Sequence, residues 1–301
     1  MTPGTPEMIG NGIVRVLAPN PSPMTGPGTN SYLLGERELA VIDPGPATAD
    51  HLEALVAAIG GRPVRAVLVT HAHRDHTDLA PELARRTGAP VVAFGDSRAG
   101  RSAAMEALAE AGGIGGGEGV AEGFRPDVTM ADGESINGAD WSLRAFHTPG
   151  HFGNHLCFVS GDTGFSGDLV MGWTTTLISP PDGDINDFRS SCIRLRTMGL
   201  ARFLPGHGPA VEEPAERIDT LLAHRLAREE AILLALWDQE MSDLPTLTRR
   251  VYTDIPPAMH PAAARNLLAH LIDLCARGLA EAVPRIGPDA RFRRSSSVDE
   301  T

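Results

Sequence analysis

Four side chains able to bind metal ions stand within six positions of this chain: His71, His73, Asp75 and His76. They follow the apolar run 66–69, which indicates a strand, and they precede a stretch with helical periodicity. Side chains two positions apart on an extended segment project the same way, so His71 and His73 suit one metal ion. Asp75 and His76 lie where the chain bends into the helix and can face a second ion. A solvated polar loop is the alternative, but so many buried imidazoles and carboxylates are costly without a metal.

Three more candidate ligands stand further along the chain, each directly after a glycine. They are His151 in Thr-Pro-Gly-His, Asp168 in Phe-Ser-Gly-Asp and His207 in Leu-Pro-Gly-His-Gly. A glycine turn aims the next side chain while it lets the backbone approach closely. Asp162 ends a similar Ser-Gly-Asp string, but the residues after Asp168 make Asp168 the better candidate. Neutral imidazoles combined with carboxylates are a ligand set that suits Zn²⁺.

Short β-branched runs alternate with amphipathic stretches over the first two thirds of the chain, which is typical of an α/β fold. The expected strands are 13–17, 31–34, 39–43, 64–70, 91–94, 142–147, 156–160 and 164–166, and the expected helices are 49–58 and 77–86. The candidate ligands follow strand ends, where such folds keep their sites. Segment 112–123 holds seven glycines without periodicity. It predicts a loop, because a phosphate-binding loop needs a strand before it.

The chain changes character after about Val211, where helical periodicity begins to dominate. Expected helices at 214–237, 244–253 and 258–277 are followed by expected strands at 279–286 and 290–294. Three helices and a hairpin predict a winged-helix module. We therefore expect a catalytic domain at 1–211, a winged-helix-like domain at 212–295 and a disordered tail at 296–301.

The composition limits the partners and the location of the protein. A net charge of −12 argues against a non-specific grip on nucleic acid, because neutralised phosphates supply most of that affinity. All 26 basic residues are arginine, so no lysine can serve as a nucleophile. The three cysteines are far apart and predict reduced thiols. No apolar run reaches the roughly 18–20 residues that cross a bilayer, and no signal peptide stands at the start. We expect a cytoplasmic protein without membrane contact.

The order His-Ala-His-Arg-Asp-His, Thr-Pro-Gly-His, Phe-Ser-Gly-Asp, Leu-Pro-Gly-His-Gly resembles the metallo-β-lactamase-fold hydrolases over about 13–211. This resemblance implies an α/β fold, a four-layer αββα sandwich with a dinuclear site at one edge. The strings Phe-Ser-Gly-Asp-Leu-Val-Met-Gly-Trp and 179–184, together with the C-terminal region, look most like the lactamase-beta-like-2 group. Members of that group carry a winged helix after the catalytic domain.

The resemblance also implies a ligand set for two Zn²⁺ per chain. The first ion would take His71, His73 and His151, the second would take Asp75, His76 and His207, and Asp168 would bridge both. Asp43, in Val-Ile-Asp-Pro-Gly, would orient the ligands, although a turn-forming aspartate is the alternative. His155 is expected to play a similar supporting part, and Asn30 and Trp173 are expected at the substrate mouth.

Two zinc ions about 3.5–4 Å apart would lower the pKa of a shared water and provide a bridging hydroxide, with Asp75 as the catalytic residue that orients it. The expected substrate is a small-molecule ester, thioester or lactone. The alternative is a metal-dependent single-strand endoribonuclease that uses arginines of the wing. Residues 212–301 hold 11 arginines against 15 carboxylates, which favours a winged helix that shapes the mouth or mediates a homodimer. A β-lactamase, which carries Cys where this chain has Asp168, and a mononuclear iron dioxygenase fit less well.

Overall fold

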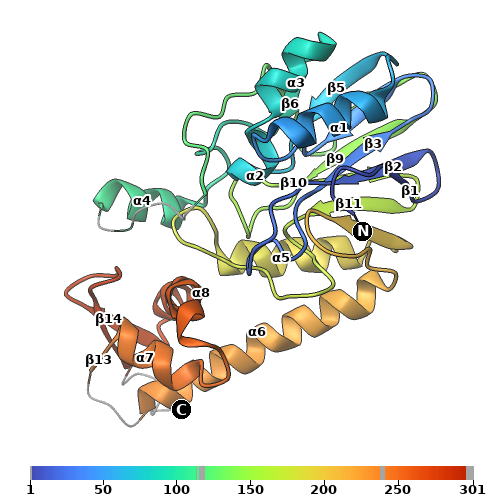
Figure 1. Cartoon of the computed structure of the whole chain (residues 1–301). Coiled ribbons are helices and arrows are strands. Elements are labelled where there is room, and N and C mark those ends of the chain that lie inside the picture. Colours follow the sequence, from blue (N-terminus) through green and yellow to red (C-terminus); the bar gives the residue numbers. More distant parts are fainter. Residues whose placement is uncertain (1, 113, 115–118, 238–240, 296–301) are drawn as a thin grey trace.

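Two β-sheets lie face to face in the larger part of the molecule (Figure 1). The structure, a computed structural model, describes residues 2–112, 114, 119–237 and 241–295. The first sheet runs in sequence order and is parallel from β4 onward. Its strands are β1 (Glu7–Met8), β2 (Ile13–Leu17), β3 (Asn30–Leu34), β4 (Leu39–Ile42), β5 (Val64–Leu68), β6 (Val91–Ala93) and β7 (Val128–Thr129).

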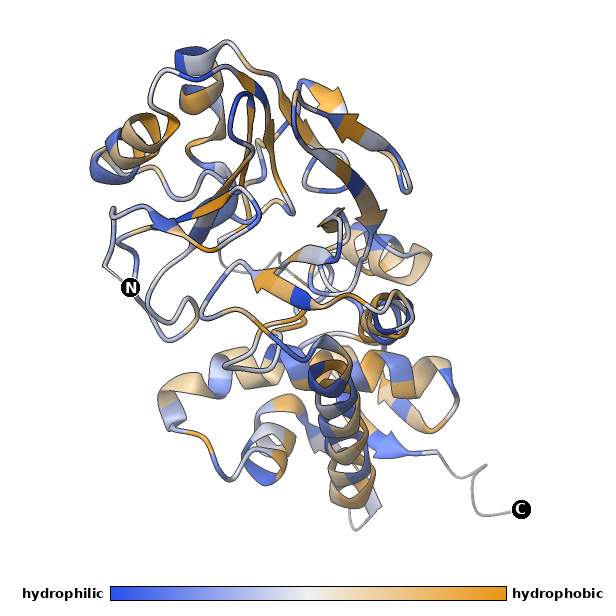
Figure 2. Ribbon diagram, turned by 90° about the vertical axis from the view of Figure 1, so that its right-hand side faces the viewer, coloured by the Kyte–Doolittle hydropathy of each residue, from blue (hydrophilic) through white to orange (hydrophobic). Residues whose placement is uncertain are grey.

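The second sheet has the order β12-β11-β10-β9-β8, and only its β11–β12 pair is parallel among the described strands. Its strands are β8 (Ser135–Asn137), β9 (Ser142–His147), β10 (Leu156–Ser160), β11 (Thr163–Gly167) and β12 (Arg202–Pro205). Between the sheets, Leu34 and Ile42 pack against Phe158 and Phe165. Because several central strands are buried on both faces, they are apolar along most of their length, as Figure 2 shows.

Helices cover the outer face of each sheet. On the first sheet lie α1 (Ala49–Ile59) and α3 (Ala80–Thr87), whose Leu55 and Leu83 join the core formed with Val41 and Val67. On the second lie α5 (Ile185–Arg196) and the first half of α6 (Pro214–Trp237), which bury Phe188 and Leu221. The order helix, sheet, sheet, helix confirms the predicted four-layer αββα sandwich (Figure 1).

The predicted helix at 77–86 is wrong at its start, because two helices occupy this stretch: α2 (Arg74–Thr77) and α3. Pro81 stands in the first turn of α3, where a missing N–H does no harm. Two described helices were not predicted, α4 (Ala103–Ala111) and α5. α5 begins at the cap residue Asp184, whose side chain accepts hydrogen bonds from the backbone N–H of Asn186 and Asp187.

The C-terminal part contains α7 (Leu244–Val251), the 3₁₀ turn η1 (Pro257–Met259) and α8 (His260–Ala276). Its sheet has three strands in the order β13-β15-β14, which are β13 (Ser242–Asp243), β14 (Ala280–Val283) and β15 (Arg291–Arg294). The prediction of a two-stranded wing is therefore wrong by one strand, because Ser242 pairs with Phe292. The predicted winged-helix arrangement of helices followed by a hairpin is otherwise present.

Helix α6 connects the two parts and contributes to both cores (Figure 1). Its Leu221 packs in the sandwich, and its Leu236 packs with α7 and α8. Met105 of α4 also joins the C-terminal core. The boundary at 211/212 stays a prediction, and the tail 296–301 and residues 113 and 115–118 of the glycine-rich segment lie outside the described residues. No helix in the described part of the chain has the length and apolarity needed to span a membrane.

His51 of α1 is a buried neutral histidine that makes stability depend on pH. Ser31 Oγ donates to the carbonyl of Asp43 at 2.5 Å, so it accepts from His51 Nε2 at 2.9 Å. Burial lowers the pKa of His51 to about 4, whereas an unfolded chain has an ordinary histidine pKa of about 6.5. Between these two pKa values His51 is protonated in the unfolded chain but neutral in the folded one. His51 therefore destabilises the fold as the pH falls below about 6.5.

We predict that His51→Gln makes the free energy of unfolding less sensitive to acid. When the pH falls from 7.5 to 5.5, the free energy of unfolding of the wild type should decrease by about 1.4 kcal/mol more than that of the variant. This difference follows from the two pKa values above. Denaturant unfolding of metal-free protein measures this difference, because metal binding has a pH dependence of its own. Equal losses in both proteins would contradict the assignment.

Candidate metal centre

The two parallel strand pairs bring the candidate ligands to one edge of the sandwich. β4 and β5 are parallel, so Asp43 and the segment from His71 onward follow strand ends that point the same way. β11 and β12 are also parallel, which places Asp168 and His207 together. His151 joins them from the connection between β9 and β10. The structure thus gathers all seven predicted ligands in two groups: His71, His73, His151 and Asp168, and Asp75, His76 and His207.

In the first group, three imidazole nitrogens converge on one point. His73 Nδ1 lies 2.9 Å from His71 Nε2 and 3.1 Å from His151 Nε2. The far nitrogen of His151, Nδ1, donates to the carbonyl of Leu177 at 2.7 Å, because a carbonyl only accepts. The Nε2 lone pair of His151 therefore faces the other rings. Converging lone pairs at this spacing are the arrangement that a shared metal ion requires.

In the second group, Asp75 faces two histidines. Asp75 Oδ2 lies 3.3 Å from His207 Nε2 and 3.5 Å from His76 Nε2, and these two nitrogens are 3.4 Å apart. His207 Nδ1 donates to the carbonyl of Gly28 at 3.2 Å, which turns its Nε2 toward the centre. Two imidazoles and one carboxylate are a set of ligands that could hold a divalent ion.

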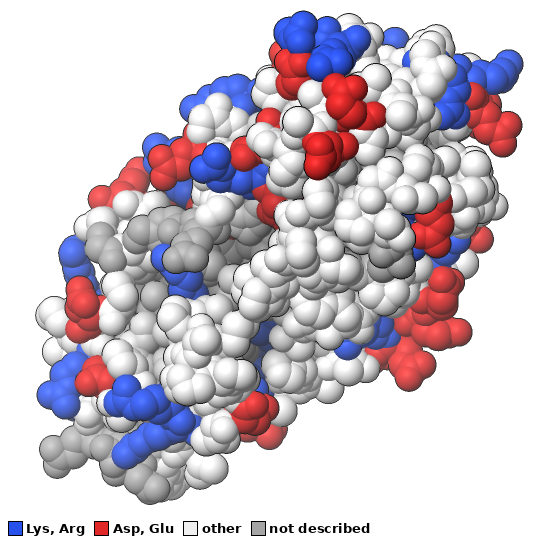
Figure 3. Space-filling model, viewed as in Figure 1, with Lys and Arg blue, Asp and Glu red and all other residues white. Residues whose placement is uncertain are grey.

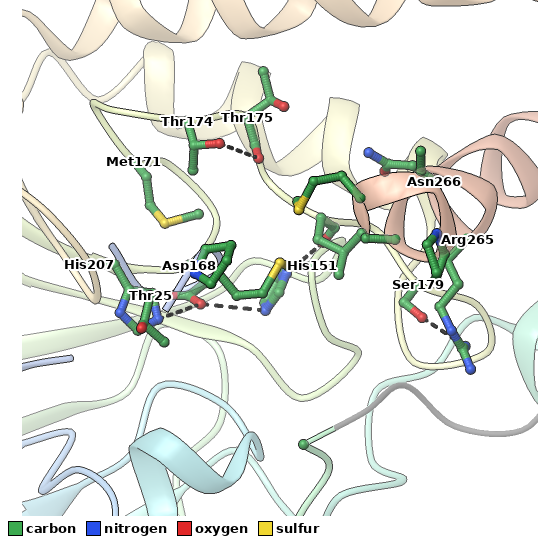
Figure 4. A pocket seen from close by; sticks show the side chains of 18 of the residues that line it. Thr25, His151, Asp168, Met171, Thr174, Thr175, Ser179, His207, Arg265 and Asn266 are labelled. Carbon is green, nitrogen blue, oxygen red and sulfur yellow. Dashed lines mark hydrogen bonds and ion pairs between the residues drawn. The ribbon is translucent and has the colours of Figure 1, made fainter. Parts of the chain in front are cut away.

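Asp168 lies between the two groups (Figure 4). Its Oδ2 is 3.2 Å from His207 Nε2 and 3.7 Å from His151 Nε2, and its Oδ1 is 3.6 Å from His76 Nε2. Oδ1 is buried and has no hydrogen-bond partner among the described residues. A buried carboxylate oxygen without a donor is rare unless a cation satisfies it, so the donor set fits metal ions at this site.

Asp43 holds one histidine of each group. His76 Nδ1 donates to Asp43 Oδ2 at 2.9 Å. Thr70 donates its backbone N–H and its hydroxyl to the same carboxylate, both at 2.8 Å, and the Thr70 oxygen then accepts from His71 Nδ1 at 3.0 Å. Asp43 has a φ of 51°, a left-handed conformation that is uncommon outside glycine. The carboxylate thus fixes the ring orientation of His71 and of His76.

The electrostatics of the two groups differ. Burial lowers the pKa of His73 to about 3 and that of His71 well below its ordinary value, so both rings are neutral and ready to bind a metal. Burial also opposes charge on His207, but Asp168 beside it raises the pKa of His207 to about 9. Before metal binds, a proton on His207 therefore balances the nearby carboxylates.

Glycines permit the close approach predicted from the sequence. A Cβ on Gly206 would lie 2.4 Å from Asp168 Oδ1 and 2.6 Å from His76 Cε1. Gly167 has a φ of 46°, and a Cβ there would lie 2.5 Å from His155 Nε2. Any side chain at Gly206 would displace two predicted ligands, so the backbone itself packs against the centre.

The remaining predicted site residues have mixed outcomes. His155 is buried with its ring 5.4 Å from that of His71, yet its Nδ1 hydrogen bond goes to Thr148 rather than to a predicted ligand. Asn30 is fully buried, and its amide donates to the carbonyls of Pro205 and Gly208. Asn30 therefore positions the turn that carries His207. The predicted contact between Asn30 and substrate is wrong, because the side chain is buried away from the cavity. Trp173 is partly exposed beside Gly208 and does not line the cavity, so its predicted contact with substrate lacks support.

The loop 174–178 supports two predicted ligands, and no pattern in the sequence pointed to it. Thr176 Oγ1 donates to the carbonyl of Asp168 at 3.1 Å, and the carbonyl of Leu177 receives the His151 hydrogen bond. Helices α6 and α8 hold this loop, because buried Arg225 donates to the carbonyl of Thr176 and Asn266 accepts from the backbone N–H of Ile178. An isolated arginine in a helix carries no sequence signal of such a role.

A cavity of about 560 Å³ opens over the centre. Five of the predicted ligands line it: His73, Asp75, His151, Asp168 and His207. Figure 4 places Thr25 and Met171 beside His207 and Asp168, and Arg265 and Asn266 of α8 further along the same space. The volume falls within the range of sites that bind small molecules.

A four-layer sandwich with histidines and aspartates gathered on the floor of a cavity at its edge is the arrangement of a metal-dependent hydrolase. The chain belongs to the Metallo-beta-lactamase superfamily, whose family model matches residues 24–207, and the Beta-lactamase associated winged helix domain matches 244–286. A Beta-lactamase-like protein 2 homolog of Caenorhabditis elegans is 28% identical over 285 residues, 91% of this chain and 88% of that protein. This similarity agrees with the group predicted from the sequence.

Two further comparisons bear on fold and chemistry. An Atrochrysone carboxyl ACP thioesterase of Aspergillus fumigatus is 32% identical over 234 residues, which cover 74% of this chain and 64% of that protein. The crystal structure of a metallo-beta-lactamase family protein from Thermus thermophilus superposes with a TM-score of 0.74 at 26% identity, covering 94% of this chain and 98% of that one. The fold therefore extends over the sandwich and the C-terminal part together.

We predict that Asp43→Asn lowers the affinity for metal by roughly 10- to 100-fold, because an amide cannot accept all three hydrogen bonds that orient His71 and His76. Competition with a chromogenic chelator measures the affinity of the variant. Asp50→Asn, an exposed change of the same charge on α1, is the matched control. An Asp43→Asn affinity within twofold of this control would contradict the role of Asp43.

Proposed function

We propose that this chain is a dinuclear zinc hydrolase that cleaves an ester, thioester or lactone of a small molecule. One observation carries the proposal: two groups of ligands, joined by Asp168, form the floor of one cavity. Imidazole and carboxylate ligands in this number favour two Zn²⁺ ions over harder cations such as Mg²⁺.

Zinc bound at both groups would supply a Lewis acid for the carbonyl and would lower the pKa of water. The chain's own contribution begins with Asp75, whose carboxylate reaches the cavity with about 27% of its side chain exposed. Burial alone would raise its pKa, but His76 and His207 hold the pKa of Asp75 below its usual range. Asp75 is therefore ionised at neutral pH and can accept a hydrogen bond that orients a water molecule.

Thr29 supports this role, since its hydroxyl donates to Asp75 Oδ2 at 3.0 Å. Asn20 in turn donates to Thr29 Oγ1 at 2.9 Å, which fixes the direction of the threonine hydroxyl. One oxygen of Asp75 is thus directed by the protein. A carboxylate held this way loses little freedom when substrate binds.

The choice of substrate rests on the cavity and on one relative. Apart from its predicted ligands, the cavity is lined mainly by apolar side chains, which suit an organic acyl group rather than a phosphate chain. A relative at 32% identity carries the name of an acyl carrier protein thioesterase, and we extend thioester chemistry to this chain on that basis. Hydrolysis would add water across the acyl bond and release a carboxylic acid with a thiol or an alcohol.

The endoribonuclease alternative has weaker support. In the wing, Arg293 pairs with Glu281 at 2.6 Å, and Arg294 lies over the ring of Trp237 at 3.6 Å. Both arginines already have partners within the chain. Among the described residues, none from β14 or β15 lines the cavity. A single-strand channel would combine cationic and aromatic side chains near the site.

We predict that zinc-loaded protein hydrolyses some member of a panel of thioesters, esters and lactones, and that Asp75→Asn lowers kcat roughly 10²- to 10⁴-fold. The physical reason is the loss of the negatively charged carboxylate that orients the attacking water. Initial rates, with metal content measured on the same sample, give the comparison.

Asp78→Asn is the matched control, because Asp78 ends α2 and pairs with the exposed Arg74 outside the cavity. Its kcat should stay within about twofold of wild type. An Asp75→Asn enzyme that keeps its kcat would overturn the role of Asp75. Cleavage of a short RNA, with every acyl substrate left intact, would favour the ribonuclease.

A further inference from the structure

Three methionines line the cavity, and each comes from a different segment of the chain. Met24 lies in the connection between β2 and β3, Met171 follows β11, and Met259 ends η1 in the C-terminal part. The whole chain has nine methionines, so a third of them meet at one site. Methionine is unbranched and polarizable, and it adapts to apolar ligands of different shape.

Met24 is exposed to 43% although it is a large apolar residue. Its loop is nevertheless fixed: Ser22 Oγ accepts from the backbone N–H of Met24 and of Thr25, both at 3.1 Å. Thr25 Oγ1 donates to the carbonyl of Asn20 at 2.6 Å. Through Asn20 and Thr29 the same network reaches Asp75. An apolar side chain held at the rim in this way is prepared to be covered by a ligand.

The C-terminal part supplies the opposite wall. Three of its apolar residues line the cavity: Ile255 from the segment before η1, Met259 from η1 and Ala263 from α8. This wall is tied to the catalytic part by Asn266, which receives hydrogen bonds from Ile178 and from Arg225. The two walls therefore belong to one fixed structure rather than to surfaces that meet by chance.

Few charges face the cavity beyond the metal centre. Of the described lining residues outside the predicted ligands, only Asp182 and Arg265 are charged. Arg101 donates to Asp182 at 2.7 Å, and Arg265 donates to Ser179 at 3.0 Å. Figure 3 also shows a broad uncharged area across the middle of the molecular face, with charged side chains gathered toward its ends. An apolar group of a ligand can therefore be buried here without removing water from a charged side chain.

We propose that this cavity is an acyl-binding site in which the apolar acyl arm of the substrate lies between Met24 and Met171 on one side and Met259 on the other. The inference rests on the proposed function, since it places the carbonyl at the metal centre. It assigns the C-terminal part a direct role, because Met259 and its neighbours become specificity determinants. The favoured substrates carry medium-length or aromatic acyl groups rather than acetyl groups.

The carboxylate product of hydrolysis retains the acyl arm, so simple carboxylates probe the site without any turnover. Calorimetric titration of zinc-loaded protein with acetate, butyrate, hexanoate and octanoate should show tighter binding as the chain grows. We expect about threefold to fourfold per buried methylene, and octanoate at least roughly 100-fold tighter than acetate. Met259→Ala and Met24→Ala should each reduce this octanoate-to-acetate ratio about tenfold.

Met8→Ala is the matched control, because Met8 is 67% exposed on β1 and does not line the cavity. Its octanoate-to-acetate ratio should equal that of wild type. A wild-type ratio near one would overturn the acyl site, and an unchanged ratio in Met259→Ala would remove the C-terminal part from it.

Parallel hydrolysis of acetyl and octanoyl thioesters separates this inference from the proposed function. Length-dependent carboxylate binding without hydrolysis of any acyl substrate would support the acyl site and refute the hydrolase proposal. Hydrolysis of both thioesters at equal kcat/KM, with no length-dependent binding, would support the hydrolase and overturn the acyl site.

Discussion

The carboxylate of Asp43 connects the end of β4 to the end of β5 and to α2, and the geometry of the centre depends on it. It accepts two hydrogen bonds from Thr70 and one from His76, and Thr70 passes the orientation on to His71. One buried group thereby sets a ring in each half of the centre. The left-handed backbone at Asp43 is a strain of about 1–3 kcal/mol that the surrounding bonds must offset. Asp168 then completes the centre by standing between its halves.

The C-terminal part is more than an appended module. Arg225 and Asn266 hold the loop whose Leu177 carbonyl orients His151, so the connecting helix α6 and the C-terminal helix α8 together determine the direction of a predicted ligand. Of these two helices, α8 also lines the cavity above the metal centre, through Ala263, Arg265 and Asn266. Metal binding, loop position and cavity shape are therefore mechanically linked through α6 and α8, a link that two independent domains would lack.

Local patterns in the sequence predicted much of this arrangement. The spacing of His71 and His73 predicted that they share one ion, and the glycines before His151, Asp168 and His207 predicted close turns. Gly206 is an example, because a Cβ added there would lie only 2.4 Å from Asp168 Oδ1. α5 escaped prediction because Arg and Ser residues stand between its apolar positions, although Ile185, Phe188, Cys192 and Leu195 recur at helical spacing and could have indicated the helix. Asn30 was assigned to substrate although its amide serves two backbone carbonyls, and such partners arise only when β3 and β12 meet in space. Long-range contacts of this kind leave no periodic trace in one sequence.

The central claim is a centre for two metal ions built from seven side chains of this chain. The most direct measurement is the metal content per folded chain, by elemental analysis after loading with zinc and removal of free metal. The account predicts about two zinc ions per chain, from the two ligand groups joined by Asp168. Fewer than one ion per folded chain after loading would contradict it.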